Sequence, residues 1–263
     1  MTIRFYKYQG AGNDFMLLDN REGVYDSLSP ADIQFVCSRR FGVGADGLMM
    51  LNAGSGPDTD FVMKYFNADG PEGSMCGNGG RCIVAFAARL GIISGRTTFQ
   101  AVDGTHEAVL RPDGWVELKM GDITRVERGE GFMVLDTGSP HYVHYVEDLA
   151  AEPVAEKGRA IRMSERFREK GINVNFVQRT GDTLQIRTYE RGVEDETLAC
   201  GTGVTAAAIV SADSQPGQYR IPVKARGGDL EVRFEKIDDQ HFRNIWLAGP
   251  AAFVYSGEIT LHE

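Results

Sequence analysis

Two cysteine-glycine motifs contain the residues of this chain best suited to acid-base chemistry. Residues 75–80 read MCGNGG and residues 199–204 read ACGTGV. Each motif follows a strand-like run and precedes an apolar, Ala-containing stretch, so we expect each cysteine where a glycine-rich turn opens a helix. A helix N-terminus stabilises a thiolate and holds an anion. The repeat therefore predicts two related half-molecules that direct two thiols, Cys76 and Cys200, at one ligand.

The other two cysteines have the pattern of packing residues. Cys37 falls inside an apolar helical pattern, and Cys82 lies in the body of the helix that follows the first motif. A free cysteine is usually a small buried hydrophobe, and four cysteines in 263 residues make no disulfide scaffold. The chain has no C-x2-C pair and its five histidines show no zincin spacing, so we expect no metal site.

Two thiols that serve one carbon can invert its configuration. A thiolate removes a proton from one face while a thiol on the opposite face delivers another, which is two-base general acid-base catalysis. The α-proton of an amino acid is only weakly acidic, so preorganised donors must hold the developing carboxylate charge, and two helix N-termini supply them. A closed cleft between the halves would exclude water and strengthen these contacts.

Two glycine-rich segments suggest other chemistry. Residues 42–47 match G-x-G-x-x-G, but a dinucleotide fingerprint follows a strand and opens a helix, whereas here a helical pattern precedes it and a strand-like run at 48–51 follows. A turn that feeds a strand is the better interpretation. Residues 10–15 lack the Lys-Ser/Thr of a phosphate loop. A nucleophilic Cys-His hydrolase with His141 as the base stays open, although it leaves the second cysteine unexplained.

The composition is that of a globular protein, with 42% hydrophobic and 25% charged residues. A net charge of −9 argues against a nucleic-acid or anionic-membrane surface, because both need a basic footprint. The N-terminal residues contain no continuous apolar segment, and no apolar run has membrane-spanning length. We expect a cytoplasmic protein whose partner is a small molecule, with no nucleic acid and no membrane.

Many short runs alternate polar and apolar residues and so predict strands, whereas only a few stretches have a helical pattern. The helical candidates are 30–40, with Ser29 as the N-cap, 81–90 and 204–212. This mixture predicts an α+β fold in which the last two helices are buried nearly all round, one through the middle of each half. The runs read as strands are 3–8, 61–66, 116–120, 183–189, 230–234 and 253–261.

The two halves share their spacing upstream of the cysteines. Asn67 lies nine residues before Cys76, and Arg191 lies nine residues before Cys200. We place the boundary near residue 121, which gives an N-terminal lobe of residues 1–121 and a C-terminal lobe of residues 122–252. The last strand, 253–261, returns to the first lobe in this scheme. An arginine at the end of a strand suits a bidentate clamp on a substrate carboxylate.

Together these motifs resemble those of the diaminopimelate epimerase family. The similarity rests on residues 10–15 (GAGNDF), 66–70 (FNADG), 189–192 (YERG) and the two cysteine motifs, in order along nearly the whole chain. It implies an enzyme without PLP or any other cofactor that interconverts LL- and meso-diaminopimelate on the lysine and peptidoglycan route. It also implies a homodimer of chains with two similar lobes, each a mixed or antiparallel β-barrel-like sheet around a central helix, with the active site in the cleft between them.

By the same resemblance, Cys76 and Cys200 match the two acid/base cysteines. His141 and Glu190 match residues that tune the pKa values of these cysteines. The resemblance implies substrate-binding roles for Asn13, Asn67, Gly77, Asn78, Asn173, Glu190, Arg191, Gly201 and Thr202.

Two positions depart from the family pattern. Members often have glutamine where this chain has Gly47, and usually asparagine where it has Ser139. A serine hydroxyl can still donate or accept a hydrogen bond, so we keep Ser139 as a contact to the distal amino-carboxylate end of the substrate.

Two other functions stay open. One is a related two-cysteine racemase that acts on proline, hydroxyproline or histidine. Proline-type relatives have histidine at the position of Asn78 and lack the run at 189–191. The other is a non-catalytic amino-acid-binding protein, which would need no reactive thiol.

Overall fold

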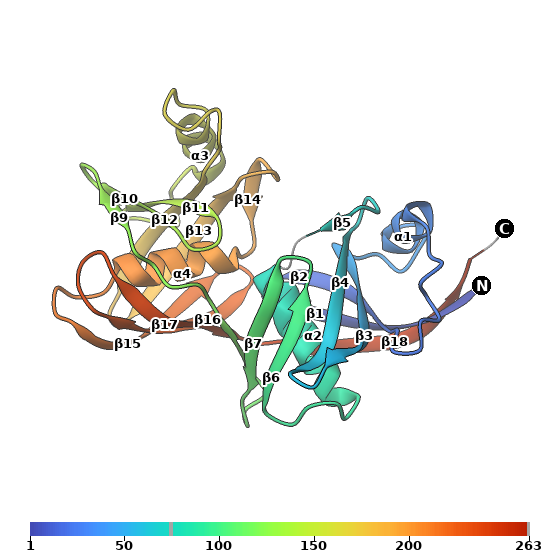
Figure 1. Cartoon of the computed structure of the whole chain (residues 1–263). Coiled ribbons are helices and arrows are strands. Elements are labelled where there is room, and N and C mark those ends of the chain that lie inside the picture. Colours follow the sequence, from blue (N-terminus) through green and yellow to red (C-terminus); the bar gives the residue numbers. More distant parts are fainter. Residues whose placement is uncertain (74–75, 262–263) are drawn as a thin grey trace. The chain divides into compact units, whose positions relative to one another are not determined.

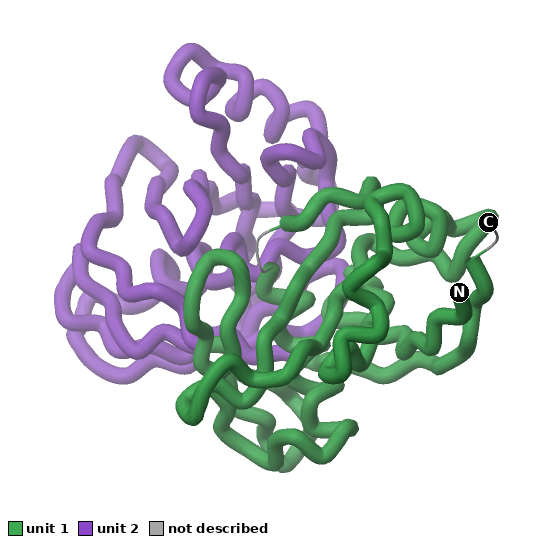
Figure 2. Tube along the Cα trace, turned by 45° about the vertical axis from the view of Figure 1, so that its right-hand side comes forward, with its two compact units in different colours: residues 1–118, 250–263 green, residues 119–249 purple. Residues whose placement is uncertain are grey.

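The computed structural model describes residues 1–73 and 76–261, so Met75, the first residue of the first motif, lies outside the described residues. The chain forms two compact units (Figure 2). Unit 1 contains residues 1–118 and 250–263, and unit 2 contains residues 119–249. Among the described residues, no helix is both long and apolar enough to cross a bilayer.

Unit 1 is a mixed sheet packed around helix α2, Gly77–Arg89 (Figure 1). Strands β1 and β2 are antiparallel, β2 and β3 are parallel, and β3, β4 and β5 are antiparallel neighbours. After α2 the chain returns as β6, which lies parallel to β4, and continues into antiparallel β7 and β8. The bounds are β1 Thr2–Gly10, β2 Asn13–Asp19, β3 Gly47–Gly56, β4 Thr59–Asn67, β5 Glu72–Gly73, β6 Arg96–Ala101, β7 Gly104–Leu110 and β8 Val116–Lys119.

Unit 2 repeats this order around helix α4, Gly201–Val210 (Figure 1). Strands β11 and β12 are parallel, β12, β13 and β14 are antiparallel neighbours, and after α4 strand β15 lies parallel to β13. Strands β16 and β17 then continue the antiparallel order. The bounds are β9 Val126–Arg128, β10 Phe132–Asp136, β11 Pro140–Tyr145, β12 Asn173–Thr180, β13 Thr183–Glu190, β14 Asp195–Thr197, β15 Gly217–Ala225, β16 Gly228–Lys236 and β17 Phe242–Gly249.

The repeat extends to the register of the strands. Phe15 of β2 faces Gly47 of β3 where the first parallel pair begins, and His141 of β11 faces Asn173 of β12 at the same place in unit 2. The last strand, β18 (Ala252–Thr260), pairs antiparallel with β1, as β9 pairs with β10. The internal repeat expected from the cysteine motifs is thus confirmed in the order and direction of the strands.

The predicted helices form, but their ends differ. The capping box of Ser29 and Asp32 starts α1 (Pro30–Cys37) as expected, but this helix ends three residues earlier than predicted. Helices α2 and α4 instead begin directly after their cysteines, because tertiary packing overrides the low helix propensity of glycine. Helix α3, Val154–Arg162, is not among the predicted helices; four of its nine residues are charged.

Burial of the two central helices agrees with the prediction. Eight residues of α4 are buried, from Gly201 to Ile209 with Thr202 excepted, and α2 buries residues 78–84 together with Phe86 and Ala87. Strands on several sides enclose each helix, with β1, β2, β3, β7 and β18 against α2. Each motif cysteine is therefore held at the end of an element that cannot shift without disturbing a core.

Candidate active site

Both motif cysteines are helix N-caps, which confirms the expectation from the glycine-rich motifs. Cys76 caps α2, and its Sγ accepts a hydrogen bond from the backbone N–H of Gly79 at 3.2 Å. Cys200 caps α4 and is 9% exposed, with Sγ 3.4 Å from the Thr202 hydroxyl. The unpaired N–H groups and positive end of a helix dipole favour the thiolate form at this position.

The remaining cysteines pack in cores, also as predicted. Burial raises the pKa of Cys37 to about 11 and that of Cys82 to about 12. Cys82 belongs to the core around α2, and Cys37 to the one that α1 covers. Both therefore stay protonated at neutral pH and have the environment of inert thiols.

A glycine in the first turn of each central helix lets that turn lie directly on the strands beneath it. A Cβ at Gly79 would lie 3.3 Å from Met49 Sδ and 3.3 Å from Cys76 Sγ. A Cβ at Gly203 would lie 3.3 Å from His141 Cε1 and closer to Asn175 Oδ1 than real Cβ atoms approach. Close packing therefore excludes a side chain at Gly203 and leaves little room for one at Gly79.

A chain of hydrogen bonds fixes two predicted substrate-binding asparagines of unit 1. Arg81 Nη2 donates to Asn78 Oδ1 at 2.7 Å, Asn78 Nδ2 donates to Asn13 Oδ1 at 2.7 Å, and Asn13 Nδ2 donates to Asp46 Oδ2 at 2.9 Å. A guanidinium can only donate and a carboxylate can only accept, so both amide orientations are determined. Asn13 and Asn78 are therefore held in one arrangement.

The two ends of this hydrogen-bond chain are differently anchored. Arg81 is fully buried, and its other donors reach the backbone oxygens of Gly77 and Pro250. Asp46 lies nearer the surface, where Arg39 Nη2 donates to it at 2.6 Å and to Asp14 at 2.6 Å. Burial would raise the pKa of Asp14, but hydrogen bonds from Arg39 and Lys7 outweigh it and hold this pKa at about 2.

Asn67 stands apart from this hydrogen-bond chain among the described residues. It ends β4 opposite Gly47, and its backbone closes the turn to Gly70 with hydrogen bonds to Pro71 O and from Gly70 N. Its side chain is exposed, in contrast to the buried Asn78.

Unit 2 brings three predicted site residues into contact. Asn173 Nδ2 donates to Ser139 Oγ at 2.8 Å, and Arg191 Nη2 donates to the same oxygen at 3.3 Å. Asn173 Oδ1 accepts from the backbone N–H of Arg191 at 2.9 Å. Most of the hydrogen-bonding capacity of Asn173 is used within the chain, so this residue orients Ser139 and Arg191. Among the described residues Ser139 Oγ only accepts, so its proton can be donated to a third partner.

Glu190 is the last residue of β13, and Thr202 is the second residue of α4. Burial raises the pKa of Glu190, and a hydrogen bond from Thr197 Oγ1 at 2.8 Å partly opposes this. The backbone oxygen of Thr202 accepts from Thr137 Oγ1 at 2.8 Å, which ties the start of α4, including Gly201, to the turn after β10.

His141 is fully buried and uncharged. Burial first, and the nearby Arg191 charge second, lower its pKa to about 3. A general base works best when its pKa lies near the operating pH. The Cys-His hydrolase alternative, with His141 as its base, is therefore disfavoured.

Tyr65 covers Gly47, the position where the family often has glutamine. A Cβ at Gly47 would lie 2.5 Å from Tyr65 Cε2 and 2.6 Å from Phe66 O. Gly47 also begins β3, and α1 precedes it, so residues 42–47 form a turn into a strand and are no dinucleotide fingerprint. The interpretation of this segment as a turn is confirmed.

Several residues that position the site were missed from the sequence. Arg81 had a usable signal, because it directly precedes the apolar run at 82–88, where a buried charge needs partners. Asp46 was hidden inside the fingerprint-like segment. Asn175 gave no signal, because its partner His141 is distant in the chain. Thr197 gave none, because its contact with Glu190 depends on the geometry of the hairpin of β13 and β14.

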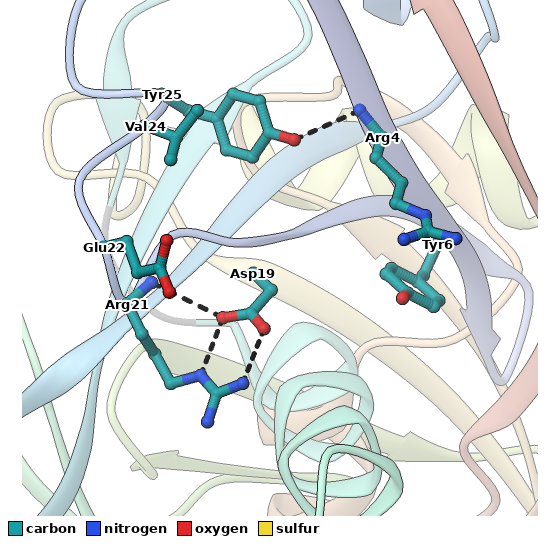
Figure 3. Close-up of a pocket in the computed structure, with 7 residues that line it drawn as sticks. All are labelled: Arg4, Tyr6, Asp19, Arg21, Glu22, Val24 and Tyr25. Carbon is teal, nitrogen blue, oxygen red and sulfur yellow. Dashed lines mark hydrogen bonds and ion pairs between the residues drawn. The ribbon is translucent and has the colours of Figure 1, made fainter.

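Two further kinds of ligand site can be examined in the described residues, a metal site and a surface cavity. Within the described part of the chain, no group of three or more His, Cys, Asp or Glu residues is arranged to hold a metal ion. A surface cavity of about 390 Å³ in unit 1 contains none of the predicted site residues (Figure 3). Two of its charged residues pair with each other, because Arg21 donates to both carboxylate oxygens of Asp19 at 2.8 and 2.7 Å.

Comparisons with known proteins agree with this geometry. The family model described as diaminopimelate epimerase matches residues 5–126 and 133–254, one match in each half. The diaminopimelate epimerase of Flavobacterium psychrophilum is 46% identical over 98% of this chain and 100% of its own length. That of Chlorobaculum tepidum is 43% identical over 96% of this chain and 99% of its own length.

A solved structure shares the fold at much lower identity. A phenazine biosynthesis protein of the PhzF family from Bacillus anthracis matches with a TM-score of 0.73 at 15% identity, over 99% of this chain and 100% of its own. The two lobes with central helices are thus a known arrangement. By the family model and the full-length relatives, this chain belongs to the diaminopimelate epimerase family.

Proposed function

We propose that this chain is a cofactor-independent diaminopimelate epimerase that interconverts the LL and meso forms, with Cys76 and Cys200 as its two bases. One observation carries the proposal: in a chain of this family, the repeated fold begins both central helices at a cysteine N-cap. Two groups that exchange protons with the α-carbon from opposite faces can invert it without a cofactor, and a pair of thiols at helix N-termini is suited to that task.

The reaction follows from the protonation states of the two sulfurs. One cysteine, as a thiolate, removes the α-proton, and the other, as a thiol, delivers a proton to the opposite face of the same carbon. The carboxylate gains negative charge as the α-proton leaves. Backbone N–H groups at Gly77 and Gly201, in the first turns of α2 and α4, are suited to hold it.

The remaining polar side chains are proposed to bind and orient the substrate. Arg191, oriented by Asn173 and Ser139, supplies a cation for a carboxylate. Asn13, Asn67 and Asn78 in unit 1, and Thr202 in unit 2, supply further hydrogen bonds.

Glu190 and His141 are proposed to tune the thiols. Burial raises the pKa of Glu190, so its carboxyl takes up a proton more readily than an exposed one does. The buried His141 stays neutral and contributes an N–H donor without a charge.

A substrate panel tests this function. Purified chain is incubated without PLP with LL-diaminopimelate, L-proline, trans-4-hydroxy-L-proline and L-histidine, and the stereoisomers are separated by chiral chromatography. Conversion of LL- to meso-diaminopimelate alone is expected. Inversion of proline or hydroxyproline in its place would favour the related racemase.

Thiol reactivity separates the enzyme from a binding protein. We expect alkylation of both Cys76 and Cys200 near neutral pH, slowed by diaminopimelate, while Cys37 and Cys82 stay unmodified in the folded chain. Peptide mass spectrometry reads all four sites. Motif cysteines that react no faster than the buried pair would contradict reactive thiols and favour a non-catalytic binder.

Three coarser features are also proposed. We propose two domains: residues 1–121 together with 253–261 form the first, and residues 122–252 form the second. We also propose a cytoplasmic location and a homodimer. Light scattering on the purified chain tests the last point, with a mass of twice 28.9 kDa expected and 28.9 kDa contradicting it.

A further inference from the structure

Asn175 and His141 form a buried polar pair beneath the first turn of α4. Both side chains are 0% exposed, and Gly203, three residues after Cys200, packs against Asn175 Oδ1 and His141 Cε1. The pair therefore lies against the turn that Cys200 begins.

The hydrogen bonds of this pair determine where the histidine proton is. Asn175 Nδ2 donates to the backbone oxygen of Tyr142 at 3.0 Å, which fixes the amide, because the flipped amide would set two oxygens against each other. Thr188 Oγ1 accordingly donates to Asn175 Oδ1 at 3.0 Å. The second Nδ2 proton points to His141 Nδ1 at 3.1 Å, so Nδ1 is an acceptor. The ring of a neutral His141 then has its proton on Nε2.

The internal repeat shows that packing alone does not require these polar groups. By strand register, Met49 and Phe15 of unit 1 occupy the positions of Asn175 and His141, and Tyr65 occupies that of Thr188. Met49 and Phe15 are fully buried, and Met49 packs under Gly79 as Asn175 packs under Gly203. A buried polar network costs free energy relative to an apolar core of the same fold. Its presence in unit 2 alone indicates a task beyond packing.

One donor of this network, the Nε2–H of His141, has no acceptor within the network. His141 Nε2 is buried and has no hydrogen-bond partner among the described residues. A buried N–H group without a partner costs free energy. Its presence here therefore indicates an acceptor that is present only during the reaction. The charged group near the ring is Arg191, which also disfavours an imidazolium.

We propose that Asn175 is a positioning residue that holds His141 in the neutral Nε2–H tautomer, as an uncharged donor to an anion formed or bound during turnover. That anion is a thiolate or a substrate carboxylate, which share the chemistry of accepting an N–H. The role in turnover rests on the proposed epimerase function. The tautomer itself does not, because the hydrogen bonds of the unliganded chain set it.

Nuclear magnetic resonance of the full chain labelled with 15N-histidine tests the tautomer directly. Long-range proton-nitrogen correlations distinguish a protonated ring nitrogen from an unprotonated one. We expect His141 to have an unprotonated Nδ1 and a protonated Nε2, unchanged between pH 8 and pH 5. His144 is an internal control, because its Nδ1 faces the Gly131 carbonyl at 2.7 Å and must carry a proton. A His144→Gln variant assigns that signal and should keep wild-type turnover.

Two substitutions connect the tautomer to the reaction. Asn175→Asp replaces the donor with an acceptor, so the His141 proton should move to Nδ1, and kcat should fall by about 100-fold with KM little changed. Asn175→Met introduces the side chain that unit 1 has at the equivalent position, Met49. It removes the donor without adding a charge, and it provides the same test if the aspartate variant does not fold. We expect loss of the single tautomer and a shifted pH profile of kcat.

A wild-type His141 protonated on Nδ1 would overturn the proposal, as would a spectrum that neither substitution changes. Altered tautomers with wild-type kcat would overturn the positioning role. A chain with the expected tautomer that does not epimerise diaminopimelate would contradict the proposed function while supporting the tautomer assignment.

Discussion

Asn78 Nδ2 donates a 2.7 Å hydrogen bond to Asn13 Oδ1, which joins the first turn of α2 to the first residue of β2. The two asparagines are 65 positions apart in the chain, and each is held on its other side by a charged partner of fixed polarity. The amide groups of Asn13 and Asn78 are therefore preorganised before any substrate binds.

Removing the acceptor at the end of this hydrogen-bond chain should weaken substrate binding. Asp46→Asn replaces a carboxylate with an amide that can also donate, so Asn13 loses its fixed orientation. A hydrogen bond to a charged group contributes about 1.5–3 kcal/mol, which corresponds to a loss of about 10- to 150-fold in kcat/KM. Steady-state kinetics measure it. Asp19→Asn, which breaks a surface pair with Arg21 in the same unit, is the control and should leave kcat/KM unchanged. Equal kinetics for both variants would show that Asp46 does not orient the site.

Gly203→Ala should destabilise the protein more than Gly79→Ala. At Gly203 the added methyl group meets Asn175 Oδ1, which its hydrogen bond from Thr188 holds in place, whereas at Gly79 it meets the flexible Met49 side chain at 3.3 Å. Overpacking of this kind costs about 1–3 kcal/mol. Urea denaturation measures the difference. Gly95→Ala, which adds a methyl group with nothing within 4 Å, gives the baseline. A Gly203 variant as stable as the Gly95 variant would contradict the close packing.

The buried neutral His141 should make the protein less stable in mild acid. Its pKa is about 3 in the folded chain, below the value near 6.5 of an unfolded one. Below about pH 6.5 His141 therefore binds a proton in the unfolded chain but not in the folded chain. Its contribution to the free energy of unfolding is complete above that pH and is lost as the pH falls toward 3. Between pH 6 and pH 4 this residue should contribute a slope of about 1.4 kcal/mol per pH unit.

His141→Phe isolates that slope, because Phe15 has the equivalent position in unit 1. The free energy of unfolding of the variant should fall less steeply with decreasing pH than that of the wild type, whatever their absolute difference. Parallel curves would mean that His141 is protonated in the folded chain.

Each motif cysteine should be essential for turnover but not for binding. Cys76→Ala and Cys200→Ala each remove one of the two groups that exchange protons with carbon, so kcat should fall by about 100-fold or more in either variant. Calorimetric titration with meso-diaminopimelate should still detect binding. Cys82→Ala, which only truncates a core thiol, is the control and should keep turnover in the folded fraction. Substantial turnover in a motif variant would contradict the two-base assignment.

Local chemistry made part of the site predictable. The cysteines were expected as helix starts because the glycines that follow them and the apolar stretch beyond are adjacent in sequence, and α2 and α4 begin there. The packing role of Cys37 and Cys82 followed equally from neighbouring apolar residues. The repeated spacing of Asn67 and Arg191 before the cysteines predicted two similar halves, which the strand order confirms.

Contacts between distant segments could not be predicted. Nothing near Asn175 in the sequence indicates that parallel pairing with β11 brings it to His141, and nothing near Gly47 indicates that Tyr65 covers it. The helix ends were misplaced for a related reason. A glycine-rich start has low helix propensity, and only the packing of Gly79 and Gly203 on the strands beneath explains why the helices begin so early.

Solvent deuterium incorporation tests the central claim most directly. LL-diaminopimelate is incubated with the wild-type chain in deuterated water without PLP, and the reaction is stopped at low conversion. Two bases predict a deuterium on the α-carbon of the meso product, because the delivered proton comes from the second, solvent-exchanged thiol, and little deuterium in the remaining LL substrate. Meso product without deuterium, or equal labelling of substrate and product from the first turnovers, would contradict the assignment of Cys76 and Cys200 as separate acid and base.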